Sequence, residues 1–298
     1  MPGKMAAKRV IQIAAFPVVW SATIAGIYLE LRAGLDPTVA ALAAATFTIV
    51  AVTLLEIFVP FRRAWRPRLH DLRVDGTSLA VTTWGVGALR YWASPLLIAM
   101  TAGIVARTTL WPTTWPYAVQ VAIAMLVAQL VTYWWHRAHH AVPLLWRFHA
   151  FHHSADRLYW VNASRSHPLE ELGSQLLVGL AVLALGAPAD VVIIASVALA
   201  TFGTFQHCNA DLAWGPLDKV LATSRVHRWH HSTIATEADH NYGSCLLVWD
   251  HVFGTYRAFA GAAPLELGTG GVVRFPEGYL AQLAAPLAWR ESYEPPRP

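Results

Sequence analysis

Two long apolar stretches near the start of the chain restrict its fold more than any other feature. Val10–Leu31 and Thr38–Phe58 are each long enough to cross the hydrocarbon core of a bilayer as a helix. Only 13% of the 298 residues are charged, whereas soluble domains carry about 25% charged residues. The sequence therefore predicts an all-α integral membrane protein.

Further apolar segments extend this prediction to about four transmembrane helices plus a membrane hairpin. Thr77–Val105 and Tyr117–Trp135 are the expected third and fourth spans, separated by a short interfacial turn at Arg107–Trp115. Leu172–Phe205, interrupted at Gly186-Ala-Pro188, reads as the hairpin. We expect three regions: transmembrane helices at 1–135, a histidine-rich region at 136–260 that includes the hairpin 172–206, and a polar C-terminal tail at 261–298. The proline-rich end, Glu294–Pro298, is expected to be disordered.

The placement of basic residues predicts the orientation. Lysines and arginines precede the first span and follow the second (Lys4, Lys8, Arg9, and Arg62, Arg63, Arg66, Arg68, Arg73). Because positive loops stay inside, this hairpin has both ends in the cytoplasm, and the later histidines emerge on the cytoplasmic face. A retained first span fits the start of the chain better than a cleaved signal peptide. We therefore expect a multi-pass protein of a bacterial inner membrane. The net charge of +4 reflects this topology rather than a surface for nucleic acid.

Histidines form the second constraint. Of 14 histidines, all but His70 fall between residues 136 and 251. Three clusters share the i, i+3, i+4 pattern that places side chains on one helical face; they are His136/His139/His140, His149/His152/His153 and His227/His230/His231. Their repeated spacing indicates one or more metal sites.

The number of histidines restricts the kind of metal site. Imidazole is a ligand for iron, zinc, copper or nickel, and one metal accepts about six ligands at most, so eight or nine histidines imply two metals or one metal and a second role. The zinc-protease signature H-E-x-x-H is missing. The two cysteines, Cys208 and Cys245, are too few for a disulfide framework or an iron–sulfur cluster. Isolated histidines such as His70, His240 and His251 are ordinarily hydrogen-bonding residues, and His139 is an intermediate case.

The amino-acid sequences of the three clusters resemble the three histidine boxes of the fatty acid hydroxylase/sterol desaturase superfamily. The resembling blocks are Tyr133-Trp-Trp-His-Arg-Ala-His-His140, Phe148-His-Ala-Phe-His-His-Ser154 and Val226-His-Arg-Trp-His-His-Ser232. Asn241-Tyr-Gly243 and Trp249–Tyr256 are similar to that superfamily's closing signature. Leu158–His167 and Gln206–Asn209 look like its bacterial sterol-desaturase-like branch.

The resemblance implies a pair of metal ions and a set of ligands and supporting residues. The implied ligands are His136, His140, His149, His152, His153, His207, His227, His230 and His231. Some relatives have a tenth ligand where this chain has Asp211; His167 is our first choice to replace it, ahead of Asn209, Asp211 or water. Relatives also often have an acidic residue before the first box, where this chain has Gln129. Carboxylates that could orient the imidazoles are Glu170, Glu171, Glu237, Asp239 and Asp250.

The resemblance also implies the chemistry. It predicts a membrane-bound enzyme with two non-haem iron ions that uses O2 to hydroxylate, or to desaturate, a C–H bond of a lipid or another membrane-partitioned molecule. The chain has no nicotinamide, flavin or haem motif, so a separate reductase, ferredoxin or cytochrome-type donor would supply electrons. Alternatives are a zinc hydrolase, which would react without dioxygen, and a metal or haem carrier.

Overall fold

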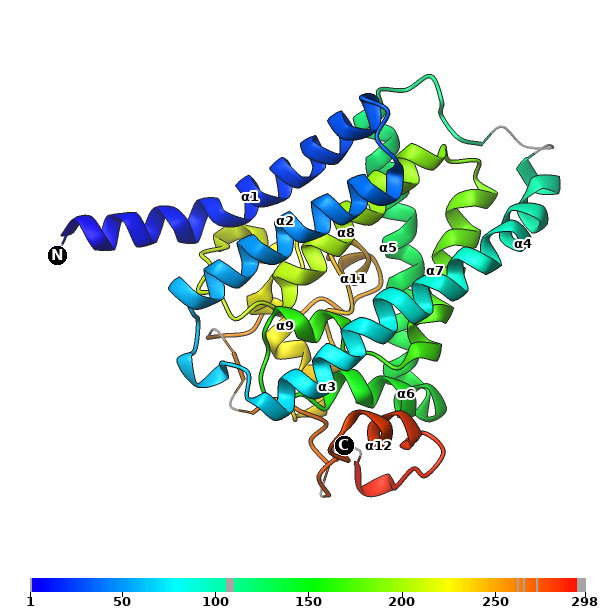
Figure 1. The fold of residues 1–298 in the computed structure, drawn as a ribbon. Helices are drawn as coiled ribbons and strands as arrows, with labels where there is room; N and C mark the ends of the chain where they lie inside the picture. Colours follow the sequence, from blue (N-terminus) through cyan, green and yellow to red (C-terminus); the bar gives the residue numbers. More distant parts are fainter. Residues whose placement is uncertain (1, 106–109, 262, 265, 272, 294–298) are drawn as a thin grey trace.

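A computed structural model of the chain describes residues 2–105, 110–261, 263–264, 266–271 and 273–293 (Figure 1). The described residues form helices and loops with three isolated β-bridges, and no strand occurs among them. The α-helices are α1 (Pro2–Arg32), α2 (Pro37–Phe58), α3 (Leu69–Ala80), α4 (Gly87–Val105), α5 (Tyr117–Ala141), α6 (Pro143–His153), α7 (Pro168–Ala184), α8 (Ala189–His207), α9 (Ser224–His230), α10 (Ala235–Ala238), α11 (Val248–Val252) and α12 (Tyr279–Ala284). The predicted all-α fold is therefore confirmed.

Four of these helices are long and apolar enough to cross a membrane: α1 from Met5, α2, α5 and α8. The helices α1, α2 and α8 pack on one another, and α5 packs on α8. Small residues on α2 and α8, such as Ala40, Ala44 and Ala198, allow the close approach of backbones that membrane bundles use. Buried hydroxyls also connect three helices, because Thr48 Oγ1 lies 3.3 Å from both Thr23 Oγ1 and Thr201 Oγ1.

The predicted third span, Thr77–Val105, is not among these four helices. It consists of the end of α3, a π-helical segment at Val81–Val86 and then α4. Arg90 and Pro95 lie within α4. The segment still carries the chain along the bundle to the end where α1 meets α2 (Figure 1). The predicted hairpin is present as α7 and α8, but α7 has only 17 residues and is short for a membrane span.

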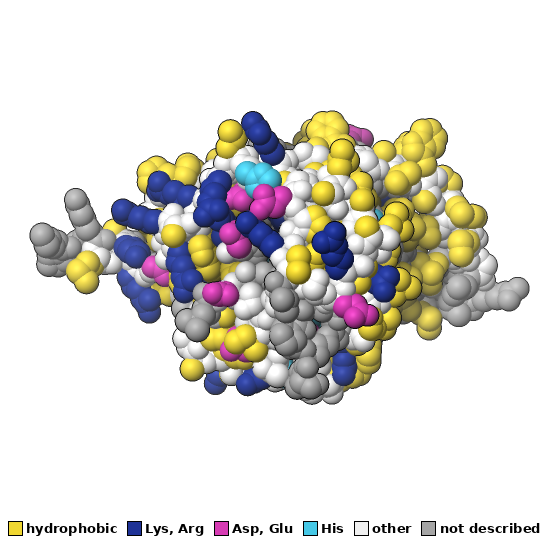
Figure 2. All heavy atoms as spheres, turned by 90° about the horizontal axis from the view of Figure 1, so that it is seen from below, with side chains coloured by type: hydrophobic (Ala, Val, Ile, Leu, Met, Phe, Trp, Pro, Cys, Tyr) yellow, Lys and Arg dark blue, Asp and Glu magenta, His cyan; other side chains and the backbone are white. Residues whose placement is uncertain are grey.

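Shorter helices lie at the other end of the bundle (Figure 1), where α12 packs on α3 and α6 packs on α5. Part of the expected polar tail is packed here, since Phe275, Ala285 and Tyr293 form a buried cluster with Trp146 and Ala150 of α6. Seen from below, Lys and Arg side chains gather on the half of this face toward which α1 extends (Figure 2). Glu294–Pro298 and residues 107–109 of the expected interfacial turn lie outside the described residues.

Candidate metal centre

Four helices bring the histidines of the clusters together. His136 and His140 lie one turn apart at the end of α5, and Pro143 then stops that helix and begins α6. The second cluster occupies the last turn of α6. His207 is the last residue of α8, and the third cluster lies on α9 and its C-cap. Each cluster thus lies at the end of a helix, where the chain turns and side chains from several helices can converge.

The structure divides nine of these histidines into two groups. The five-histidine group comprises His136, His140, His149, His153 and His230, and the four-histidine group comprises His152, His207, His227 and His231. Within each group, one ring nitrogen of every residue lies within 4.8 Å of the others. The second and third clusters each contribute to both groups, and the rings of His153 and His231 stack between the groups with their centroids 4.5 Å apart.

Hydrogen bonds decide which nitrogen carries the proton in the five-histidine group. Nδ1 of His136 donates to the carbonyl oxygen of Tyr242 at 2.8 Å, and Nδ1 of His230 donates to that of His240 at 3.0 Å. Nδ1 of His149 lies 2.6 Å from Glu170 Oε1. These acceptors select the neutral tautomer with the proton on Nδ1, so each Nε2 is unprotonated and carries a lone pair. Yet Nε2 of His136 lies 3.0 Å from Nε2 of His149 and 2.9 Å from Nε2 of His230.

The four-histidine group repeats this arrangement. Nδ1 of His152 donates to the carbonyl oxygen of Arg165 at 2.8 Å, and Nδ1 of His207 donates to that of Gly203 at 3.0 Å. The two Nε2 atoms then face each other at 3.3 Å, and Nε2 of His227 lies 2.9 Å from that of His207. Convergent lone pairs repel one another unless a cation lies between them.

The spacing of these nitrogens fits a metal ion. Two imidazole nitrogens bound at right angles to one cation at about 2.1 Å lie about 3.0 Å apart. The observed Nε2–Nε2 distances of 2.9–3.3 Å match that value. Burial and the neighbouring imidazoles lower the pKa of His149, His153 and His231 well below the ordinary value. These rings are therefore neutral near pH 7, as a metal ligand must be.

Carboxylates orient two members of the five-histidine group. Glu170 contacts His149, and Asp239 Oδ1 lies 2.9 Å from Nδ1 of His140. Such partners fix the orientation of a ligating ring and raise its basicity. In the four-histidine group, the hydrogen-bond acceptors of His152 and His207 are backbone carbonyls instead.

His167 does not join either group. Its Nδ1 accepts the backbone N–H of Leu169 at 3.2 Å, and its Nε2 lies 3.2 Å from the carbonyl oxygen of Leu283. Both ring nitrogens are thus engaged in capping α7 and holding the C-terminal segment. Our choice of His167 as a tenth ligand is therefore not supported by its position.

The other proposed ligands and supporting residues also have partners of their own. Asn209 exchanges hydrogen bonds with the backbone of Arg62, and Asp211 contacts Gln12 and Lys8. Glu171 contacts Gln175, Glu237 contacts Ser232, and Asp250 accepts from the backbone N–H groups of Tyr242 and Gly243. His70, His139, His240 and His251 lie outside both groups.

Two residues have roles that the spacing of the clusters could not reveal. Tyr242 provides the carbonyl that orients His136, and its ring contacts those of His136, His140 and His230. Gln129 accepts the backbone N–H groups of Cys245 and Leu246 and so holds the loop beyond Tyr242. In the sequence, Tyr242 could be identified only through the Asn241-Tyr-Gly243 signature, which does not indicate what the residue does.

Several known proteins are similar in sequence to this chain. The fatty acid hydroxylase family profile matches residues 121–255. The chain is 32% identical to the ornithine lipid hydroxylase OlsE of Rhizobium tropici over 245 residues, which cover 81% of this chain and 73% of that protein. This chain belongs to the fatty acid hydroxylase/sterol desaturase superfamily.

Other members of the superfamily match a shorter region. The human alkylglycerol monooxygenase is 32% identical over 126 residues, which cover 42% of this chain and 28% of that protein. The zebrafish alkylglycerol monooxygenase is 32% identical over 124 residues, or 27% of its length. No solved structure matches the chain. All nine histidines of the two groups lie within the region that matches the fatty acid hydroxylase profile.

Proposed function

We propose that the protein is a membrane-bound diiron oxygenase that uses O2 to hydroxylate a C–H bond of a lipid. The observation that carries this proposal is the convergence of nine buried or half-buried imidazoles in two adjacent groups whose bare nitrogens face one another. Two groups allow two ions, and an imidazole donor set suits iron. The relatives named as hydroxylases and monooxygenases favour iron and dioxygen over hydrolysis.

In this proposal each group holds one ion. The chemistry that a bound iron pair supplies is the reduction of dioxygen coupled to the oxidation of a C–H bond. Glu170 and Asp239 orient the imidazoles of the five-histidine group, and the carbonyls of Arg165 and Gly203 orient those of the four-histidine group. The four-histidine group has one protein ligand fewer, which leaves room for a small molecule or water at that ion.

The membrane context supports a lipid substrate. The candidate spans α5 and α8 end directly at His140 and His207, so the two groups lie next to the apolar part of the molecule. Basic residues around the first two spans favour a bacterial inner membrane with the site on the cytoplasmic face. A soluble or membrane-bound electron donor could reach that face. The relative named as an ornithine lipid hydroxylase favours a polar membrane lipid.

Metal analysis of the purified full chain in mild detergent tests the proposal. We expect about two irons per chain, and Mössbauer spectra of iron-57-labelled protein should show coupled ions. His152→Ala and His230→Ala each remove one member of a group and should lower the iron content, whereas His251→Ala changes an exposed histidine outside both groups and should not.

Lipid analysis then tests the reaction. Cells that express the wild-type chain should contain lipids that have gained one oxygen, and the His152→Ala and His230→Ala strains should lack them. Lipids that have lost two hydrogens would indicate desaturation. A single zinc that persists after reconstitution with iron would contradict the diiron oxygenase.

A further inference from the structure

A polar cavity of about 720 Å³ is lined by residues that do not belong to either histidine group. Its walls come from the start of α3, the segment that follows α6, and the C-terminal segment around residues 266–282. Two lining residues adjoin the histidine clusters, since Ser154 directly follows His153 and Thr233 lies two residues after His231. A molecule in this cavity would therefore lie close to the histidine groups.

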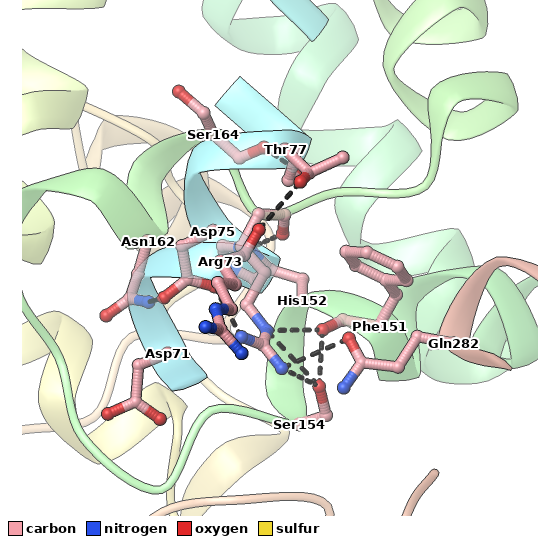
Figure 3. Close-up of polar contacts among 12 residues, drawn as sticks. Asp71, Arg73, Asp75, Thr77, Phe151, His152, Ser154, Asn162, Ser164 and Gln282 are labelled. Carbon is pink, nitrogen blue, oxygen red and sulfur yellow. Dashed lines mark hydrogen bonds and ion pairs between the residues drawn. The ribbon is translucent and has the colours of Figure 1, made fainter. Parts of the chain in front are cut away.

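A hydrogen-bond network of cavity-lining residues lies next to His152 (Figure 3). Asp75 on α3 is 1% exposed and accepts hydrogen bonds from Tyr159, Asn162 and Arg165. Arg165 also donates to Ser154 Oγ at 2.9 Å, and its carbonyl oxygen accepts from Nδ1 of His152. The same residue thus lines the cavity with its guanidinium and orients a histidine with its backbone.

One part of the cavity presents hydrogen-bond donors. Among the described residues, none accepts a hydrogen bond from the backbone N–H groups of Thr269, Gly270 or Gly271. Gly270 has a φ of +71°, and a Cβ on Gly271 would lie 2.4 Å from the carbonyl oxygen of Ser292, so glycine is required at both positions. Successive backbone N–H groups in a loop can form a concave site that binds anions. Arg68, which is exposed, lines the same cavity.

Carboxylates also line this cavity, so it carries negative as well as positive charge. Glu266 is exposed and has no ion-pair partner in the part of the chain that is described. Glu277 pairs with Arg274 at 2.8 Å, but both side chains are more than half exposed, so this pair exchanges readily with solvent or a ligand. Acidic and basic side chains lie close together on the lower face of the molecule (Figure 2). A ligand with a single sign of charge would meet repulsion from one of these sets.

We propose that this cavity binds the zwitterionic headgroup of the lipid substrate, with its oxyanion on the glycine loop and Arg68 and its amine on the carboxylates. This inference rests on the proposed lipid hydroxylation. Arg68 lies ten residues after Phe58, where the candidate span α2 ends, so a lipid in the adjacent leaflet could extend its headgroup into the cavity. The carbon presented to the histidine groups then lies near the headgroup rather than deep in the acyl chain.

Binding of water-soluble probes to the full chain in neutral detergent tests this inference by calorimetry. The probes are dihexanoyl-phosphatidylethanolamine and Nε-octanoyl-lysine, which are phosphate and carboxylate zwitterions, and dihexanoyl-phosphatidylglycerol, which is anionic. We expect at least one zwitterion to bind about fivefold more tightly than the anionic lipid. The zwitterion that binds more tightly shows whether the oxyanion of the headgroup is a phosphate or a carboxylate. Arg68→Glu should weaken that binding about tenfold.

Arg66→Glu is the matched control, because Arg66 is exposed in the same connection but does not line the cavity. It should leave probe binding within about twofold. Equal binding of all three probes, or equal losses in both variants, would overturn the inference.

Lipid products separate this inference from the proposed function. If Arg68→Glu forms oxygenated lipid at the wild-type rate, the cavity does not hold the headgroup and hydroxylation still stands. If zwitterions bind as expected but no oxygenated lipid forms in wild-type cells, the lipid oxygenase is wrong and the cavity remains a binding site.

Discussion

Replacing Asp75 with asparagine should destabilise the protein strongly although the side chain keeps its shape. Asp75 is 1% exposed and Arg165 is 6% exposed, so neither charge can be compensated by water. The variant leaves the Arg165 cation buried without its carboxylate and removes the charge that Tyr159 and Asn162 also contact. Removing one partner of a buried ion pair costs about 3–5 kcal/mol. We expect a loss of that size in the free energy of unfolding.

The assay is denaturation of the full chain in mixed micelles, with Glu277→Gln as control. Glu277 also pairs with an arginine, but the two side chains are 56% and 77% exposed, and such a pair is worth about 0.5 kcal/mol. Asp75→Asn should also lower the metal content, because Arg165 supplies the carbonyl that orients His152. Equal, small losses of stability in the two variants would refute the reasoning that burial determines the cost.

Two further substitutions probe the metal centre and the packing of the bundle. Glu170→Gln replaces the carboxyl group 2.6 Å from His149 Nδ1 and should lower metal affinity about 10- to 100-fold in a chelator competition. Glu171→Gln, whose carboxylate contacts Gln175, should not, and equal losses would exclude an effect through His149. Gly173→Ala places a Cβ 2.7 Å from the Trp135 ring and should cost about 1–3 kcal/mol of unfolding free energy. Gly179→Ala on the same helix meets Leu97 at 3.7 Å and should be neutral or slightly stabilising, so similar losses in both variants would contradict this packing argument.

Local spacing in the sequence predicted which histidines to consider but not how they divide into two groups. The i, i+3, i+4 pattern identified the histidines because side chains at these positions share a helical face. It could not show that His152 and His153 belong to different groups, since that depends on how α5, α8 and α9 pack around α6. The sequence could not show that His167 contacts Leu283, because the two residues lie 116 positions apart.

Hydropathy likewise predicted where the long helices lie but not their internal form. Hydropathy located α1, α2, α5 and α8, whose apolar runs are continuous. It did not reveal that the segment 77–105 is divided by a π-helical stretch, or that it packs along α7. The buried carboxylate of Asp75 on the preceding helix was also not predicted, because its partners on the segment 159–165 are brought to it by the fold.

The adjacent histidine pairs His152–His153 and His230–His231 have a consequence for assembly of the protein. Each pair sends one ring to the five-histidine group and its neighbour to the four-histidine group. The distance between the two groups is thus set by consecutive residues of the same short helices. It does not depend on the length of the loops that connect those helices. In the proposed diiron centre, a cation bound by either group would also hold the backbone that carries ligands of the other, so that binding at the first site would prepare the second. Maturation should consequently yield empty and fully loaded molecules, with half-loaded ones scarce.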